Sequence, residues 1–331
     1  MSKRFQNRMA ESHYALLSTA FITLIVWYLS GLVSKQLYLQ LAFFAVSTYL
    51  MMELNNSNSL IRIYSRMVSC SFMLLASAAL HLFQSLDTSL VTLCFITFLL
   101  TIFNTYQDKQ AAGWTFYAFL SIGIASTIFP QIIFFVPFVW LFMAFLLMAL
   151  SPRTFGASVI GLLAPYWFIA PYCLLTDNAG FFTSLYERLI EFQPLFQYDE
   201  ISLGLILPFA LTTLSAIIGT VHFLRNSFRD KIRTRMFYNI FIYFDLLIVL
   251  FIVLQPQHFP TLLCMMIVVT SPLIGHFVAL TNTRATNVLF CILLAAVLLI
   301  TLMNLLPEHY IFQGILPLLP SFEGIGGGVH A

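Results

Sequence analysis

Three apolar segments follow one another between Asn104 and Asp177, with only short polar breaks between them. The breaks are Pro130 with Gln131, and then the stretch SPRTFG at 151–156. An apolar helix of this kind is suited to cross a lipid bilayer, because all of its backbone hydrogen bonds close within the helix itself. Since each break is so short, each segment must cross and return almost at once. We therefore expect the three segments to pack as neighbours.

Composition extends this interpretation to the whole chain. Hydrophobic residues form 60% of the 331 residues, charged residues form 8%, and the mean hydropathy is +0.92. A water-soluble domain of this size needs more polar residues to cover its surface. The sequence therefore predicts an all-α, polytopic transmembrane helix bundle. The net charge of +2 and the scatter of the basic residues over separate short loops argue against a nucleic-acid partner.

The apolar runs predict about eleven spans. The first begins at Ala15 after a charged lead, and we interpret it as an uncleaved span rather than a signal peptide. The other runs fall at 38–54, 67–83, 89–106, 114–129, 132–150, 157–175, 204–224, 237–254, 261–280 and 288–305. Runs of about 16–21 residues give roughly 24–32 Å of helix, which matches a hydrocarbon layer of about 30 Å. The pair at 114–129 and 132–150 leaves a second interpretation open, a re-entrant hairpin that enters and leaves on one side.

The distribution of basic residues predicts the orientation of the chain. If the N-terminus is cytoplasmic, thirteen lysines and arginines fall in inner segments, and two, Lys35 and Arg188, fall in outer segments. Basic residues collect on the cytoplasmic side of membrane proteins, so we expect the N-terminus inside and the C-terminus outside. The predicted organisation is a cytoplasmic lead over 1–14, a single transmembrane domain over 15–305 and an outer interfacial tail over 306–331.

Two longer loops differ in character. The outer loop at 176–203 has apolar residues at helical spacing, which predicts an amphipathic helix on the outer membrane surface. The apolar positions are Phe182, Leu185, Leu189 and Phe192. The inner loop at 225–236 is compact and basic. We interpret it as an orientation signal that also contacts anionic lipid headgroups, and the second interpretation is docking of a cytoplasmic protein partner. Its basic residues are Arg225, Arg229, Lys231, Arg233 and Arg235.

Asp245 is the acidic residue placed well inside a predicted span. A charge there costs several kcal/mol unless it is paired, neutral or in a wet cavity, so Asp245 is a candidate functional residue. His276 on the next predicted span lies at a similar depth, with an offset of roughly 4–5 Å. We predict that the two side chains meet. Asp245 is then a candidate for proton or substrate handling, and the alternative is a structural hydrogen bond between Asp245 and a Ser, Thr, Asn or Tyr on a neighbouring helix.

The motif APYWFIAPY carries two prolines in one predicted span. Pro165 and Pro171 each remove a backbone N–H, which frees the carbonyls of Gly161 and Trp167 and predicts a kinked helix. A kinked helix at membrane depth with aromatic residues beside it is typical of a cavity that holds a ligand or a lipid. The alternative is ordinary packing with an outer aromatic belt. The aromatic residues are Tyr166, Trp167 and Tyr172.

No motif for a metal or cofactor is present in the sequence. The five cysteines lie in apolar runs without a close CxxC pair, and the histidines in the spans form no HExxH spacing. No glycine-rich phosphate loop and no GxSxG motif occurs either. We therefore expect no metal and no cofactor.

Two stretches resemble a family of bacterial polytopic inner-membrane proteins whose function is unassigned. They are ELNNSNSLIR at 53–62 and the segment from 104 to 177, which contains SIGIAS, a proline at the hairpin and GLLAPY. The likeness is an ordered pattern rather than a catalytic motif. The resemblance implies a multi-pass helical fold in the bacterial inner membrane, and it implies no catalytic residues.

These observations favour an integral envelope component of the inner membrane, either a scaffold or a lipid-handling subunit, because few charges lie within the spans. The alternative is a membrane glycosyltransferase-like enzyme that uses a polyprenyl-phosphate-linked donor. Such an enzyme needs an acidic residue in the first outer loop, where this chain has SKQL, so Asp87 or the patch at 198–200 would have to replace it. The third interpretation is a secondary transporter, although no paired repeats are visible.

Overall fold

The structure is a computed structural model, which describes residues 4–176, 180–192 and 202–305. These residues form α-helices and short 3-10 helices, and they contain no β-strand. The predicted all-α class is therefore confirmed for this part of the chain. The predicted outer tail at 306–331 lies outside the described residues.

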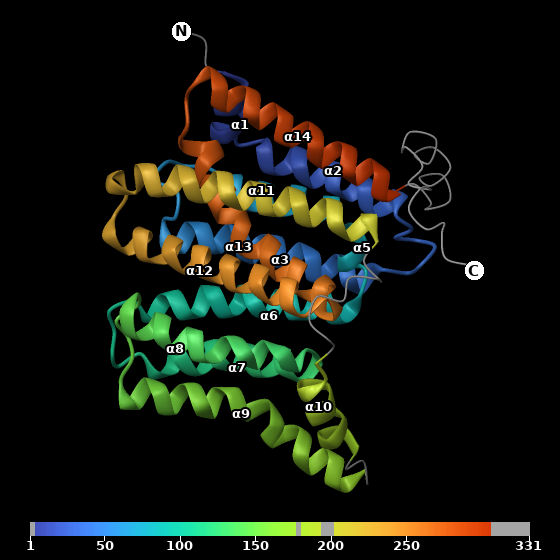
Figure 1. The fold of residues 1–331 in the computed structure, drawn as a ribbon, viewed down its shortest axis with the longest axis vertical. Coiled ribbons are helices and arrows are strands. Elements are labelled where there is room, and N and C mark those ends of the chain that lie inside the picture. Colours follow the sequence, from blue (N-terminus) through green and yellow to red (C-terminus); the bar gives the residue numbers. More distant parts are fainter. Residues whose placement is uncertain (1–3, 177–179, 193–201, 306–331) are drawn as a thin grey trace, which may run out of the picture.

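Successive helices are joined by short connections (Figure 1). The α-helices are α1 (Phe5–Glu11), α2 (Ala15–Leu29), α3 (Tyr38–Asn58), α4 (Met67–Ala78), α5 (Leu80–Phe83), α6 (Leu86–Ile102), α7 (Ala112–Ile128), α8 (Val136–Phe145), α9 (Pro152–Leu175), α10 (Gly180–Ile190), α11 (Leu203–Asn226), α12 (Ile232–Leu254), α13 (Phe259–Leu280) and α14 (Arg284–Leu305). The 3-10 helices are η1 (Phe103–Thr105), η2 (Pro130–Phe135), η3 (Ser227–Arg229) and η4 (Pro256–His258).

Six helical segments are long and apolar enough to cross a membrane: Leu86–Thr105, Pro152–Leu175, Leu203–Arg229, Ile232–Leu254, Pro256–Leu280 and Arg284–Leu305. The bent pair α1 and α2, which meet at 95°, brings the number to seven if they form one span. Met67–Ala78, Ala112–Ile128 and Pro130–Phe145 are apolar but shorter. The helix α3 contains the expected span at 38–54. It is not one of the six, because polar residues interrupt its apolar sequence. Helices that are long and apolar enough to cross a membrane are thus shown, and the expected number of about eleven is not reached by length and apolarity alone.

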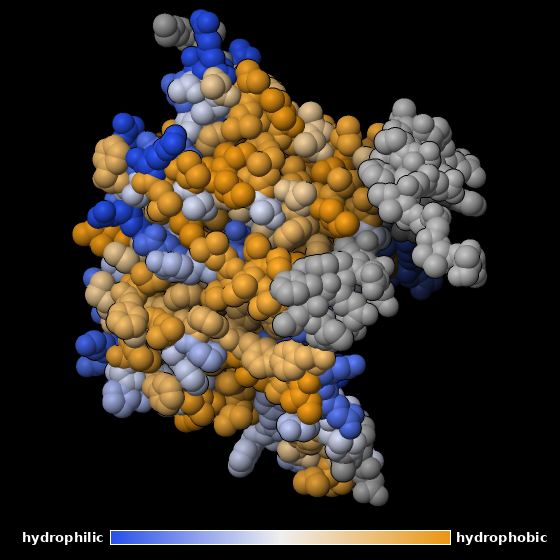
Figure 2. All heavy atoms as spheres, in the orientation of Figure 1, coloured by the Kyte–Doolittle hydropathy of each residue, from blue (hydrophilic) through white to orange (hydrophobic). Residues whose placement is uncertain are grey.

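The helices run side by side between two opposite edges of the molecule (Figure 1). Figure 2 shows hydrophobic residues over the middle and hydrophilic ones gathered at the edge where the turn between α11 and α12 lies. This distribution is what a helix bundle in a bilayer requires, because its middle contacts hydrocarbon and its edges contact water.

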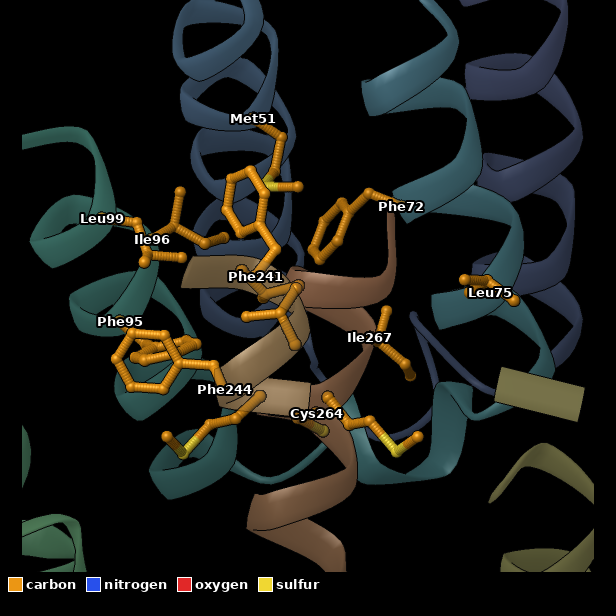
Figure 3. Packing of buried hydrophobic residues seen from close by; sticks show 14 of the residues in the cluster. Met51, Phe72, Leu75, Phe95, Ile96, Leu99, Phe241, Phe244, Cys264 and Ile267 are labelled. Atoms are coloured by element: carbon orange, nitrogen blue, oxygen red, sulfur yellow. The ribbon is translucent and has the colours of Figure 1, made fainter. Parts of the chain in front are cut away.

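The helix α13 forms the centre of the bundle. Residues 262–279 of α13 are all buried, and the helix packs against α4, α6, α11 and α12. A helix that is apolar on every side can be stabilised only by such complete enclosure. Side chains from α3, α4, α6 and α12 meet those of α13 in the core, among them the labelled Phe95, Phe244 and Ile267 (Figure 3).

Gly219 allows α11 to approach α13 very closely. A Cβ atom at this position would lie 2.6 Å from the backbone carbon of Leu273 and 2.7 Å from its carbonyl oxygen. Only glycine fits such a contact without moving one helix away from the other, and small residues commonly have this role between membrane helices. The close crossing fixes one wall of the site described below.

One edge of the molecule carries the basic loops, and we call it the basic face. Hydrogen bonds link Arg4 to Asn282 (3.2 Å) and Arg233 to Asn58 (3.1 Å), and Ser151 donates to the carbonyl of Lys109 (2.8 Å). These contacts join loops that are far apart in the sequence. The described basic residues of the inner segments are Arg4, Arg8, Arg62, Arg66, Lys109, Arg153, Arg225, Arg229, Lys231, Arg233, Arg235 and Arg284.

The opposite edge holds the helix α10, which lies within the predicted outer loop. Gln131 donates to the carbonyl of Arg188 (2.7 Å), so the break between α7 and η2 reaches the end of the molecule where α10 lies. The pair α7 and η2–α8 therefore extends from the basic face to the far edge. The amphipathic helix ends at Ile190, two residues before Phe192, the last position of its apolar spacing.

Candidate functional site

Asp245 and His276 lie on adjacent helices, as predicted, but they do not pair. Thr270 donates its hydroxyl to the Asp245 carboxylate at 2.9 Å, and both side chains are buried. Thr270 precedes His276 by six residues, which is about 9 Å along α13. Depth along the helix therefore brings Asp245 to the hydroxyl rather than to the imidazole. The predicted pairing is wrong, and the alternative of a structural hydrogen bond describes Asp245.

The partner of His276 is Asp230, a residue that the sequence analysis missed. The ring atom Nε2 of His276 lies 3.1 Å from Oδ2 of Asp230, and the side chains are 1% and 3% exposed. Arg62 approaches the other carboxylate oxygen at 4.0 Å. Asp230 is the single acidic residue within the basic stretch RNSFRDKIRTR. This isolated carboxylate is the feature of the sequence that could have identified Asp230, because a single acidic residue among basic ones usually has a specific partner.

The His276–Asp230 pair attaches the turn between α11 and α12 to the central helix. Two more rings surround it, Tyr238 at 4.9 Å and His222 at 5.4 Å between ring centroids. Buried charges are tolerated only when they are paired and hydrogen-bonded. Among the described residues, Nδ1 of His276 and Nε2 of His222 are buried without a hydrogen-bond partner.

Beside this pair lies a groove of about 700 Å³ between α11, the end of α13 and the start of α14, which we call the α11–α14 groove. Its α11 wall is aliphatic at residues 217–221 and becomes polar and basic towards the basic face. The lining residues are Ile217, Ile218, Val221, His222, Arg225, Asn226, Arg229, Phe277, Leu280, Thr281, Asn282, Thr283, Thr286 and Leu289.

The groove exists because α11 and α14 diverge. Near the far edge the two helices touch, since Asn304 donates to the carbonyl of Gly204 at 3.4 Å and to that of Ala78 at 2.7 Å. Towards the basic face α14 turns away from α11 (Figure 1). The helix α1 packs on α13 and α14 from another side, and Gln6 donates to the carbonyl of Val278 at 2.8 Å. The opening between α11 and α14 is thus left free by α1.

The basic loop residues have different roles. Arg225 and Arg229 are exposed, line the groove and form no hydrogen bond or ion pair with a described residue. Arg233 is engaged, because it donates to Asn58 and lies over the ring of Phe237 at 5.2 Å. Lys231 lines a second cavity with Arg229. Arg235 is half-buried, and its Nε has no partner among the described residues.

The APYWFIAPY motif lies on the periphery of the molecule, in the last half of α9. The helix continues through Pro165 and Pro171, and its ribbon changes direction along its length (Figure 1). Trp167 is 80% exposed and Tyr172 is 67% exposed, so neither lines an enclosed cavity. The hydroxyls of Tyr166 and Ser126 lie 2.7 Å apart. The exposed aromatic rings fit the alternative interpretation of an aromatic belt.

The remaining chemical candidates do not form a cluster. In the part of the chain that the structure describes, no three histidine, cysteine or acidic residues are arranged to hold a metal ion. Asp87 is exposed at the start of α6, and the patch at 198–200 lies outside the described residues. No protein-family model, curated protein or solved structure matches the chain. The family resemblance of 53–62 and 104–177 stays a prediction.

Proposed function

We propose that the protein is a lipid-handling component of the bacterial inner membrane, which binds an anionic phospholipid in the α11–α14 groove. The observation that carries this proposal is the change in the lining, from aliphatic side chains to two free guanidinium groups, along one wall. Acyl chains favour the aliphatic part, and a lipid phosphate favours Arg225 and Arg229. The proposed role includes the contact with anionic lipid that the sequence predicts for the basic loop.

The dimensions of the groove suit one lipid leaflet. Ile217 and Arg225 are eight residues apart on α11, which is about 12 Å. Half of a hydrocarbon layer of about 30 Å is about 15 Å, so the wall from the aliphatic side chains to the guanidinium group extends through most of one leaflet. A lipid that enters sideways between α11 and α14 would keep its headgroup at the basic face.

The experiment measures the lipid that stays with the protein. The full chain is purified in mild detergent, and bound phospholipid is counted by native mass spectrometry. Arg225→Gln should lower the retained anionic phospholipid about five- to tenfold, because one arginine near a lipid surface contributes about 1 kcal/mol or more. Val221→Trp should lower it as well, since the indole fills the aliphatic wall without changing the charge.

The matched control is Arg284→Gln. Arg284 is also an exposed arginine near this face, at the start of α14, but it does not line the groove. The lipid content of this variant should equal that of the wild type. Equal losses in Arg225→Gln and Arg284→Gln would indicate a general charge effect, and unchanged lipid in Arg225→Gln would contradict the proposal.

The orientation is part of the same proposal. We infer about eleven crossings with the basic face in the cytoplasm, supported by the shared edge of the basic loops and by the positive-inside tendency. In a variant without native cysteines, Lys231→Cys should react with a membrane-impermeant maleimide only after the membrane is opened. Thr183→Cys on α10 should react in intact spheroplasts. Labelling of both positions from the same side would reject this orientation.

A further inference from the structure

A second cavity opens on the basic face, next to the groove, and Arg229 lines both. It has a volume of about 410 Å³ and lies between the end of α3, the segment at 59–65 and the start of α12. We call it the Arg62 pocket. Arg62, Arg229 and Lys231 line it together with Asp230. Neither the lipid groove nor the sequence analysis accounts for it.

The charge within the Arg62 pocket is positive. Asp230 is the one carboxylate in its lining, and that carboxylate is already engaged by His276 and Arg62 with its side chain 3% exposed. Arg62 keeps 40% of its side chain exposed. The Lys231 side chain is exposed and has no hydrogen bond or ion pair with a described residue. Two cations at least are therefore available to a ligand, and the cavity favours a ligand with negative charge.

The start of α12 adds donors to the same cavity. Lys231 is the N-cap residue, and no side chain caps the first N–H groups of this helix. Thr234 in the first turn also lines the pocket. Free N–H groups at the beginning of a long helix favour negative charge. These N–H groups add to the positive charge of the arginine and lysine side chains, and by themselves they would not identify a binding site.

The walls of the Arg62 pocket are held in place before any ligand binds. Asn55 donates its side-chain amide to the carbonyl of Ser65 at 3.1 Å and accepts from the N–H of Ile61 at 3.2 Å. The segment at 59–65 is thus closed onto the end of α3. Asp230 on the opposite wall is fixed by His276 at 3.1 Å. Such preorganisation lowers the entropy that binding would otherwise cost.

We propose that the Arg62 pocket binds a phosphate group through Arg62 and Lys231. Arginine forms paired hydrogen bonds with phosphate oxygens, and lysine adds a point charge. The pocket lies where the membrane surface meets water, so the phosphate belongs either to a free soluble compound or to a lipid headgroup. The chemistry is the same in both cases, and the inference does not depend on the lipid groove.

The test uses the full chain in phosphatidylcholine nanodiscs, with inorganic phosphate as the soluble probe and phosphatidic acid as the lipid probe. Phosphate binding is measured by calorimetry, and enrichment of phosphatidic acid is measured by lipid analysis. The variant Arg62→Gln with Lys231→Gln should weaken binding about tenfold or more, because it removes charge-assisted hydrogen bonds. Lys231→Gln alone should weaken it too, and this residue has no described contact whose loss would unfold the protein.

The matched control is Arg66→Gln. Arg66 follows the same segment, donates to the Tyr64 hydroxyl at 3.0 Å and does not line the pocket. Phosphate binding that is lost in the pocket variants and kept in this control supports a soluble source. The same pattern for phosphatidic acid alone supports a lipid source. Binding of neither probe, or equal binding by wild type and pocket variants, overturns the proposal.

Arg225→Gln separates this inference from the proposed lipid function. Arg225 lines the groove and not the Arg62 pocket. We expect Arg225→Gln to keep phosphate binding while it loses groove lipid, and the Lys231→Gln variant to show the reverse. Either proposal can therefore fail while the other stands.

Discussion

Asp230→Leu should destabilise the folded protein by about 3–5 kcal/mol, because it leaves the buried imidazole of His276 without its partner. The carboxylate and the imidazole are 3.1 Å apart and almost fully buried, so water cannot replace the lost contact. Asp230→Asn should cost less, since an amide oxygen still accepts a hydrogen bond. The measurement is the loss of monodisperse, detergent-solubilised protein on heating.

The control for this prediction is Asp108→Leu. Asp108 is an exposed acid in the loop between η1 and α7, and it accepts a hydrogen bond from the N–H of Gln110 at 2.8 Å. We expect a change within about 1 kcal/mol there. Combining Asp230→Leu with His276→Leu should cost less than the sum of the single changes, because the second substitution removes the group left unpaired. Additive losses would show that the two side chains are not coupled.

Gly219→Val should separate α11 from α13 and lower the stability by about 1–3 kcal/mol or more. The clash is with the backbone of Leu273, at 2.6 Å and 2.7 Å, and backbone atoms on the fully buried α13 have nowhere to move. Because Gly219 lies next to the aliphatic wall of the groove, we also expect altered lipid retention in the surviving protein. Thermal stability and lipid content are measured on the same sample.

Gly156→Ala is a control substitution that should raise the stability instead of lowering it. Gly156 lies inside α9, and a Cβ atom there would meet nothing within 4 Å. Alanine in place of an uncrowded helical glycine stabilises by up to about 1 kcal/mol. A stabilised Gly156→Ala beside a destabilised Gly219→Val would assign the loss to the α11–α13 contact. Equal behaviour of both variants would contradict the close crossing.

The sequence predicts the parts of the fold that depend on local pattern. The apolar runs locate the helices, and the positions of the basic residues anticipate that their loops share one face. The burial of Asp245 also follows from its place within an apolar run. For α3 the pattern was less decisive, since an expected span at 38–54 proved to be part of a longer helix with polar interruptions.

The candidate site depends on features that a run of residues does not contain. The depths of Asp245 and His276 were estimated from residue counts, and this estimate was wrong, because Thr270, about 9 Å from His276 along α13, lies level with Asp245. The groove exists because α11 and α14 meet at Gly204 and Asn304 and diverge elsewhere, and helix divergence leaves no periodic signal. The exposure of Trp167 likewise depends on which neighbours α9 has, not on the two prolines beside it.

The enclosed position of α13 sets an order for the biogenesis of the protein. A ribosome completes α4, α6, α11 and α12 before it synthesises α13, so Asp245 enters the membrane before Thr270 exists to pair with it. The nascent bundle then has a vacant central slot with unpaired polar groups along its wall. Completion of α13 both fills the slot and satisfies those groups. A product terminated before Phe259 lacks the helix that fills its core, so the core can be completed only at this late step of translation.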